Sequence, residues 1–246
     1  MYRMACVNVS ELLLQLLLRE NPEWHSHPVA VVDRDKPQGR LLWVNRHARR
    51  HHILPGMTYA AALSLCDGLH ARDVPPPDIE RAVEVLARHL RRSPPSVECE
   101  CSFSGVAGGA EPGVFWLNAS GLDRLYESLT RWADSIRATI ARFERFECAV
   151  VVGFTKFGTY AVSRMAVSPG KTTGNSSHRF VQVFEEPQAE EQAARAVPLE
   201  YLSLAASTRD TLIRLGVHTL GDFADLPPDG MTRRFGKSRD QIAIPP

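Results

Sequence analysis

Hydrophobic positions in the first third of the chain alternate between short apolar runs and longer amphipathic stretches. Runs rich in Val and Leu and bounded by turn residues are typical of strands, whereas apolar residues spaced three or four apart are typical of helices. This pattern predicts strands at residues 4–9, 27–33 and 40–45, and helices from Glu11 onward, at 46–52 and at 57–66. Strands and helices therefore alternate from the N-terminus.

The clearest helical pattern in the sequence lies at residues 79–92. Its charged residues fill one face, and its apolar positions share the other: Ile79, Val83, Leu86 and Leu90. Tandem prolines favour an extended backbone, so the preceding stretch 74–78 is predicted to be a stiff boundary.

The middle of the chain contains two further predicted strands and a long helix. Residues 96–104 alternate between apolar and polar positions, which predicts a strand, and residues 105–113 have the composition of a glycine-rich loop. A strand at 114–118 and a helix at 120–143 follow, with Ser120 as the expected N-cap.

The chain changes character after residue 168. A strand at 146–154 and a helix at 155–168 end the α/β part, and a linker rich in glycine and serine follows. Beyond it we expect short helices and no strands, including a helix–hairpin–helix at 207–227 around Gly216. The sequence therefore predicts an α+β domain, a linker and a small all-helical domain.

Composition and charge are those of an ordinary globular protein. Of the 246 residues, 44% are hydrophobic and 23% are charged, and the formal net charge is +1. This balance gives no global attraction to nucleic acid, so binding would depend on a local patch such as Arg46–Arg50, for which the alternative is a solvated helix face. His47 and His51 lie one helical turn apart, but no acidic or cysteine partner is near in sequence, so a basic helix is favoured over a metal site.

The cysteines and the hydrophobic runs bear on the cellular setting. Five cysteines are scattered without a Cys-x-x-Cys pair, which favours a reducing environment. The N-terminus lacks the pattern of a secretory signal, and no apolar run reaches the length of about 20 residues that a membrane span needs. We therefore expect a cytoplasmic protein with no membrane partner.

Four segments of the chain, taken in order, resemble the Y-family (DinB/UmuC-type) translesion DNA polymerases. The first is ACVNVSELLLQLLLRENP with the following PVAVV, and the second is VNRHARRHHILPGM. The third and fourth are FWLNASG and VVVGFTKFGTYAVSRMA, and the tail LGVHTLGDFADLP is similar to the family's thumb. Each motif is moderate by itself, but their order and spacing cover essentially the whole chain.

This resemblance implies a right-hand architecture of palm, fingers and thumb within an α+β fold. It places the palm at 1–10 and 76–168, the fingers at 11–75, a linker at 169–197 and the helical, helix–hairpin–helix thumb at 198–246. The family carries a further DNA-gripping little-finger domain, which is absent from this sequence. From this we expect a fragment or a naturally truncated protein.

Family members hold two metal ions with carboxylates, and the sequence departs from this pattern at every corresponding position. The resemblance places these positions at Asn8, Ser10, Gly113 and Val114. Two-metal phosphoryl transfer needs hard, charged oxygen ligands, which none of these side chains supplies. We therefore expect no catalytic residue, no bound metal and no cofactor.

Other positions that contact nucleotide in the family are partly replaced. By resemblance, the aromatic residue that gates the ribose falls near Leu13, and a triphosphate-contacting lysine falls near Val162. A phosphate-contacting arginine is retained as Arg49, and its tyrosine companion is replaced by Arg46. The candidates for phosphate or nucleotide binding are Arg46 and Arg49, and those for the DNA backbone are Arg50 and Gly216.

The joint loss of these acids is similar to the ImuB-type subgroup, which has a polymerase-like fold without the catalytic carboxylates. It implies a non-catalytic adaptor in damage-induced (SOS) mutagenesis that binds DNA, weakly in this chain, and recruits an error-prone polymerase. The implied partners are the sliding clamp, an ImuA-type RecA-like protein and a C-family polymerase, mostly through a C-terminal region that this sequence lacks.

Two other functions remain open from the sequence. In the first, Glu98 and Glu100 act as substitute carboxylates in a weak, Mn²⁺-dependent nucleotidyltransferase. In the second, the polymerase fold is a protein-interaction scaffold that does not touch DNA. The stretch 203–207 lacks the glycines of the family's first thumb hairpin, which favours weakened backbone contact there.

Overall fold

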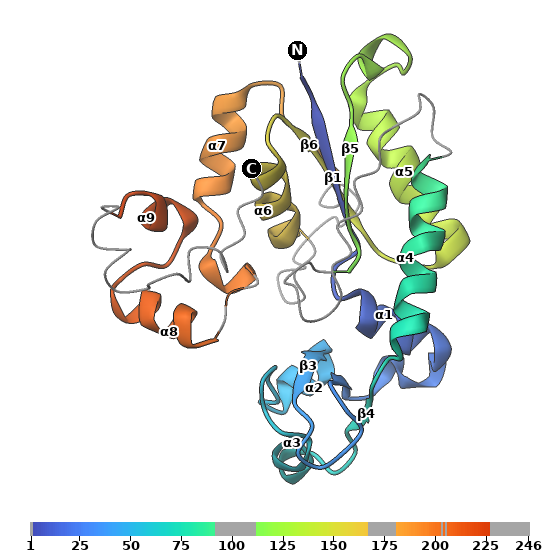
Figure 1. Cartoon of the computed structure of the whole chain (residues 1–246), viewed down its shortest axis with the longest axis vertical. Coiled ribbons are helices and arrows are strands. Elements are labelled where there is room, and N and C mark those ends of the chain that lie inside the picture. The colour runs from blue at the N-terminus through green and yellow to red at the C-terminus, as the bar shows by residue number, and fades with distance from the viewer. Residues whose placement is uncertain (1, 92–111, 167–180, 203, 205, 227–246) are drawn as a thin grey trace.

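The computed structural model describes residues 2–91, 112–166 and 181–226, except 203 and 205, and places them in two sheets with surrounding helices (Figure 1). The larger sheet has the strand order β5-β1-β6-β7, and the smaller sheet has the order β3-β2-β4. The α+β class predicted from the sequence is confirmed. Among the helices described, none is both long enough and apolar enough to cross a membrane.

The larger sheet consists of β1 (Met4–Asn8), β5 (Val114–Asn118), β6 (Ala149–Gly153) and β7 (Val181–Val183). β1 runs antiparallel to both β5 and β6, whereas β7 is parallel to β6. Because β1 lies between two partners, all five of its residues are buried and its C-terminal end is held in register on both sides. The strands predicted at 4–9, 114–118 and 146–154 are therefore confirmed.

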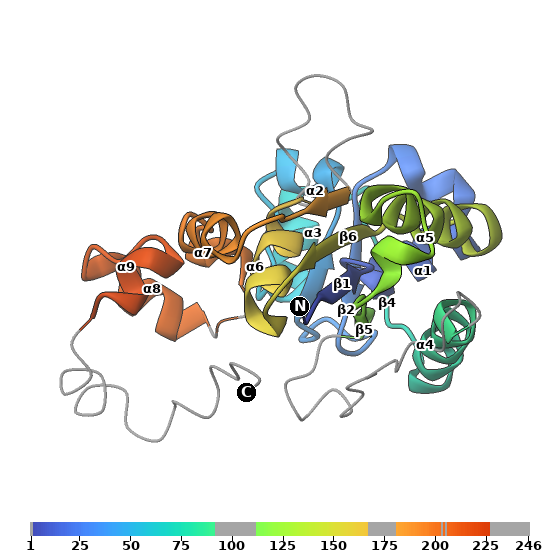
Figure 2. The same cartoon turned by 90° about the horizontal axis from the view of Figure 1, so that it is seen from above.

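The two faces of this sheet pack against different helices. These helices are α1 (Leu12–Glu20), α4 (Pro76–Arg91), α5 (Leu129–Glu144) and α6 (Lys156–Ala166). Ala5 and Val7 join a core with α1, α4 and α5. Cys6 and Asn8 point the other way, toward α6, where both contact Ser163. Figure 2 shows α5 and α6 on opposite sides of β1.

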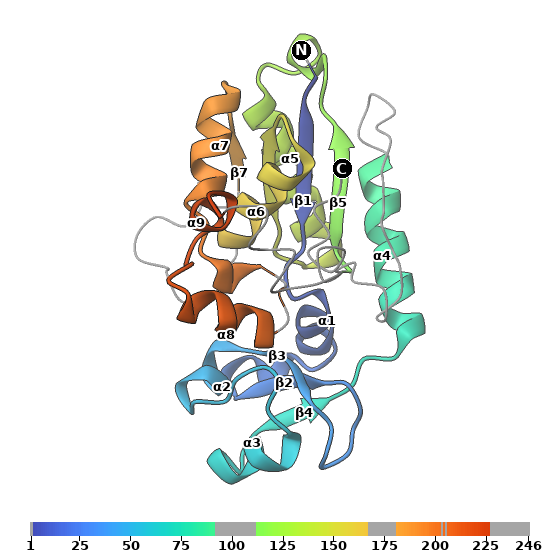
Figure 3. The same ribbon diagram turned by 60° about the vertical axis from the view of Figure 1, so that its left-hand side comes forward.

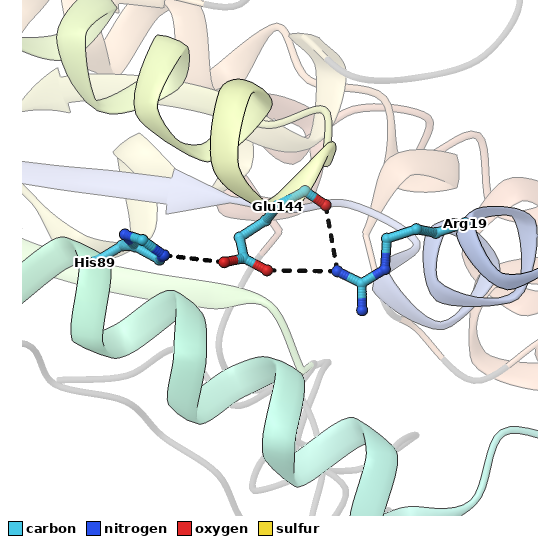
Figure 4. A network of polar contacts seen from close by, with 3 residues as sticks. All are labelled: Arg19, His89 and Glu144. Carbon is cyan, nitrogen blue, oxygen red and sulfur yellow. Dashed lines mark hydrogen bonds and ion pairs between the residues drawn. The ribbon is translucent and has the colours of Figure 1, made fainter.

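A polar network joins α1, α4 and α5 where their ends converge (Figure 4). Glu144 Oε1 lies 2.9 Å from His89 Nε2, and Glu144 Oε2 lies 3.4 Å from Arg19 Nη1. Arg19 also donates to the backbone oxygen of Glu144 over 3.3 Å, and the His89 ring stacks on Phe143. One carboxylate thus ties three helices on this face of the sheet.

The smaller sheet forms a separate unit with its own core. It contains β2 (Val29–Val32), β3 (Leu41–Val44) and β4 (His70–Arg72), with helices α2 (Arg46–Arg50) and α3 (Tyr59–Leu65). β2 is antiparallel to β3 and parallel to β4. α1 and the short 3-10 helix η1 (Pro22–Ser26) connect β1 to β2, and Figure 3 shows this unit below the larger sheet.

The C-terminal elements pack against α6. They are α7 (Pro187–Arg195), the 3-10 helix η4 (Leu199–Tyr201), α8 (Ala206–Arg214) and α9 (Leu220–Ala224). A second buried cluster joins them to α6 through Val162, Ala194 and Leu212. The predicted pair of helices around Gly216 is confirmed, and α9 begins after its N-cap Thr219.

Glu190 anchors α7 to the larger sheet. Its side chain is buried, and its carboxylate accepts hydrogen bonds from Phe154 N over 2.5 Å, Thr155 N over 3.1 Å and Thr155 Oγ1 over 2.5 Å. These donors lie in the turn between β6 and α6. A Cβ at Gly153 or Gly158 would collide with this carboxylate, so both glycines make room for it.

The helix predicted at 120–143 begins later than expected. A 3-10 turn, η2 (Leu122–Arg124), comes first, and α5 starts after Ser128, whose Oγ accepts a hydrogen bond from Arg131 N. Ser120 is not the N-cap, because its Oγ accepts from Arg3 N over 2.9 Å instead. Ser120 therefore bonds to a residue distant in sequence, and Ser128 caps α5 instead.

Two other stretches contain elements that the sequence pattern did not predict. The predicted linker 169–197 contains a strand and a helix, β7 and α7, which attach to β6 and α6. β7 has three residues, too few for a period to be visible in sequence. The predicted boundary 74–78 contains the first turn of α4, a place where proline is tolerated. The predicted strand 96–104 and most of the loop 105–113 lie outside the described residues.

Candidate functional site

The C-terminal end of β1 brings together the four positions that the resemblance assigned to metal ligands. Asn8 lies opposite Val114 of β5, and Val9 N donates a hydrogen bond to Gly113 O over 2.8 Å. Ser10 follows β1, and its hydroxyl donates to Asn8 Oδ1 over 3.1 Å. Positions 8, 10, 113 and 114 therefore share one end of the larger sheet.

Asn8 is 1% exposed, and its amide is satisfied on both sides by neutral groups. Its Nδ2 donates to Ser163 Oγ over 2.9 Å, while its Oδ1 accepts the hydrogen bond from Ser10. Ser163 in turn donates to Tyr160 O over 2.7 Å. Cys6 lies on the same face, and burial raises the pKa of its thiol to about 12. The network therefore carries no charge at neutral pH.

Backbone geometry restricts position 113 to glycine. Gly113 has φ +99°, a conformation that side chains disfavour. A Cβ there would lie 2.7 Å from Val9 O and 3.2 Å from Leu12 Cβ. The close approach of β1 and β5 thus fills the space that a side chain at 113 would need.

The donor set at this end of the sheet does not fit a pair of Mg²⁺ ions. Positions 8 and 10 offer one amide oxygen and one hydroxyl, whereas Gly113 has no side chain and Val114 is aliphatic. Mg²⁺ in phosphoryl-transfer sites is held by carboxylates. In the described ranges, no three His, Cys, Asp or Glu side chains are close enough to share a metal ion. Glu98 and Glu100 lie outside those ranges.

Arg49, the predicted phosphate contact, reaches this end of the sheet from α2. Its Nη2 lies 3.6 Å from Glu11 Oε1, and Glu11 follows Ser10 directly in a left-handed conformation with φ +52°. Arg49 Nε is buried and has no hydrogen-bond partner among the described residues. The guanidinium is thus engaged by a carboxylate of the chain itself, a partner that the sequence analysis missed.

Arg46 and Arg50 lie on the exposed side of α2. The helix is fixed at its start by Asn45, whose Oδ1 accepts from Ala48 N over 2.9 Å. His47 is half-buried, and burial and the nearby charges of Arg46 and Arg50 hold its pKa below the ordinary value. These side chains form a basic surface, consistent with the basic helix favoured from the sequence.

The hairpin at Gly216 has its backbone amides occupied from within the chain. Gly216 N donates to Ile213 O over 3.0 Å, and the left-handed conformation of Gly216 (φ +79°) turns the chain. The next amides, His218 N and Thr219 N, donate to Asp222 Oδ2 over 2.9 and 2.8 Å. These two bonds hold the pKa of the Asp222 carboxyl below its ordinary value. Both amides are therefore bonded to a carboxylate of the chain itself, which belongs to the capping box of α9.

Two positions assigned to nucleotide contact by resemblance lie in apolar cores instead. Leu13 is buried in the cluster beneath the larger sheet, and Val162 is buried in the cluster shared with α7 and α8. Neither side chain is exposed to a ligand. Ser163, the main partner of Asn8, was not predicted, because a single serine on a buried helix face gives no sequence signal.

The fold defines the class of protein. Among solved structures, DinB from Sulfolobus solfataricus matches with a TM-score of 0.71 and 15% identity over 96% of this chain and 64% of that chain. A DinB family error-prone DNA polymerase from the same organism gives a TM-score of 0.69 at 15% identity over 96% and 63%. An insertion ternary complex of Dbh DNA polymerase gives 0.68 at 16% identity over 96% and 64%. The chain thus has the Y-family polymerase fold and spans less than two thirds of these chains.

The family follows from the sequence profile of the impB/mucB/samB family (IMS), which matches residues 7–166. The chain belongs to this family. No curated protein sequence matches the chain significantly.

Proposed function

We propose that the chain is a non-catalytic member of the impB/mucB/samB family that binds DNA during translesion synthesis without incorporating nucleotides. The family and the Y-family fold support a context of DNA damage tolerance. Recruitment of an error-prone polymerase, with the sliding clamp and an ImuA-type protein as further partners, is the adaptor part of the proposal and rests on the ImuB-type resemblance.

One observation carries the proposal: the neutral network of Asn8, Ser10 and Ser163 at the end of β1. Catalysis by two metals requires charge at this position to balance the ions and the phosphates between them. The Asn8 amide carries no charge, and both its nitrogen and its oxygen are already hydrogen-bonded inside the protein. It therefore supports no metal coordination at this position. DNA binding is supported by the exposed basic side of α2.

The first experiment asks whether the chain incorporates nucleotides. Primer extension with the full chain in Mg²⁺ and in Mn²⁺ is expected to give no product. Extension that disappears in Glu98→Ala or Glu100→Ala would overturn the proposal in favour of an enzyme with substitute carboxylates.

The second experiment measures binding of the same chain to primer–template DNA as a function of salt. The logarithm of affinity should fall steeply with the logarithm of salt concentration, because basic side chains release counterions from phosphates. The double variant Arg46→Ala/Arg49→Ala should reduce this slope by about two.

The matched control is Arg81→Ala/Arg88→Ala, which removes two exposed arginines from α4. Its slope should equal that of the wild type. A flat salt dependence in the wild type would favour a protein scaffold that does not touch DNA.

A further inference from the structure

One end of the smaller sheet gathers aromatic and basic residues from three separate segments. Val29 at the start of β2 is in register with His70 at the start of β4, and Ala30 lies opposite Val44 at the end of β3. η1 precedes β2 and α2 follows β3, so both also lie at this end. Residues far apart in sequence are therefore neighbours here.

At this end, the ring of His70 contacts two other rings. Trp24 and His70 stack with their centroids 4.8 Å apart and an interplanar angle of 18°. His27 meets His70 edge-on at 5.3 Å, and the Arg72 guanidinium lies 5.4 Å from the centre of the Trp24 ring. His27 and Arg72 are exposed, whereas Trp24 and His70 are half-buried. We call these four side chains the ring cluster.

The basic helix α2 is attached directly to this cluster. Asn45, its N-cap, donates from Nδ2 to His27 O over 2.7 Å. Arg46, Arg50 and His27 all contribute to the lowered pKa of His47. The ring cluster and α2 are therefore close enough to act on the same side chain. The surface is thus aromatic on one side and cationic on the other.

The acidic residues near this end of the smaller sheet form no ion pair with its arginines. Glu23 on η1 and Asp73 after β4 are both exposed. Within the described part of the chain, no ion pair engages Arg46, Arg50 or Arg72. Three guanidinium groups therefore remain for an external anion.

We propose that the ring cluster and α2 form a binding site for single-stranded nucleic acid. Proteins that hold single strands combine rings, on which unpaired bases stack, with basic groups that follow the backbone. A single strand offers free base faces to the ring cluster, whereas the bases of a duplex are already stacked on one another. The phosphates then lie along Arg46, Arg50 and Arg72. This inference rests on the proposed DNA-binding function and assigns part of it to a particular surface.

The test is the affinity of the full chain for a fluorescent oligothymidine of about ten nucleotides, measured by anisotropy. The double variant His27→Ala/His70→Ala should bind at least about fivefold more weakly, because one stacked base is lost. The control is His25→Ala, on the 3-10 helix that carries Trp24; among the described residues its ring hydrogen-bonds to Pro22 O and stacks on no other ring. It should bind like the wild type.

A second pair of variants tests the phosphate contacts and leaves all three rings in place. Arg72→Gln should lower the salt slope for the oligonucleotide by about 0.7, the value for one phosphate on a single strand. Arg81→Gln on α4 should leave the slope unchanged. If the double histidine variant fails to fold by circular dichroism, His27→Ala alone and Arg72→Gln decide, because both side chains are exposed.

The outcomes separate this inference from the function on which it rests. Wild-type affinity in both His27→Ala/His70→Ala and Arg72→Gln, with primer–template binding intact, overturns the ring-cluster site alone. If the wild type binds neither primer–template DNA nor the oligonucleotide at low salt, the proposed DNA-binding function is overturned as well.

Discussion

Asn8 is a buried polar side chain whose hydrogen-bond partners are neutral hydroxyl groups. An aspartate at the end of β1 needs a counter-charge or water, and the structure surrounds this position with a hydroxyl on each side and a sheet strand on each flank. The amide matches that setting, since it both donates and accepts and carries no charge. The packing around position 8 therefore suits a neutral amide.

Asn8→Asp should lower the free energy of unfolding by about 2 kcal/mol near pH 8, because it buries a carboxylate between neutral hydroxyl groups. Burial raises the folded-state pKa of the new acid above its unfolded value of about 3.9. The deficit is therefore absent below about pH 4 and grows as the pH rises through the folded-state pKa. Urea denaturation near pH 4.5 and near pH 8 measures it.

The control for this variant is Asn118→Asp, at the exposed opposite end of β5, which should be as stable as the wild type. Mg²⁺ should not rescue Asn8→Asp, because positions 10, 113 and 114 add no carboxylate. Stabilisation of the variant by Mg²⁺ would instead reveal a metal site at the end of β1.

At the scale of elements, the attachment of α7 depends on one acid. Glu190 brings a carboxylate to three donors at the start of α6, where the helix dipole also favours negative charge. Two glycines without side chains admit it. A buried carboxylate with three hydrogen bonds therefore joins the C-terminal helices to the larger sheet.

Glu190→Ala should lower the free energy of unfolding by about 3 kcal/mol, because the donors of Phe154 and Thr155 lose their acceptor. Glu191→Ala, one residue along α7 and exposed, is the matched control and should change stability by less than about 0.5 kcal/mol. Urea denaturation compares them, and equal midpoints would show that α7 is held by its apolar contacts alone.

The sequence predicted those elements whose own pattern decides their structure. The strands at 4–9 and 114–118 and the helix at 79–92 have clear periods, and the structure contains them. It did not predict contacts made by distant partners: Ser120 bonds to Arg3 and leaves the capping of α5 to Ser128. The position of the candidate site followed from the order of the motifs. The hydrogen bond of Asn8 to Ser163 and the ion pair of Arg49 with Glu11 depend on the folded chain and were not predicted.

At the scale of the whole molecule, two carboxylates of the chain engage a guanidinium and two backbone amides, groups for which an external anion would have to compete. Glu11 pairs with Arg49, and Asp222 accepts hydrogen bonds from two backbone amides of the hairpin at Gly216. Each carboxylate repels a phosphate and competes for the same donors. A molecule with a net charge of +1 whose own carboxylates engage these donors should bind DNA weakly.

The double variant Glu11→Gln/Asp222→Asn should therefore bind primer–template DNA more tightly than the wild type, by about tenfold at low salt. The control Glu80→Gln/Asp210→Asn makes the same change in net charge at exposed positions on α4 and α8. Anisotropy across a salt titration compares the two. Equal gains in both variants would mean that net charge, and not the two occupied sites, limits the affinity.

Gly113 makes one corner of this site resistant to substitution. A carboxylate at position 8 requires the change of one side chain, but at 113 any new Cβ meets the backbone oxygen of Val9. The main chains of β1 and β5 would have to separate before an acid at 113 could fit. Whatever function the protein performs, this backbone therefore accepts one residue type at the point where β1 and β5 approach each other.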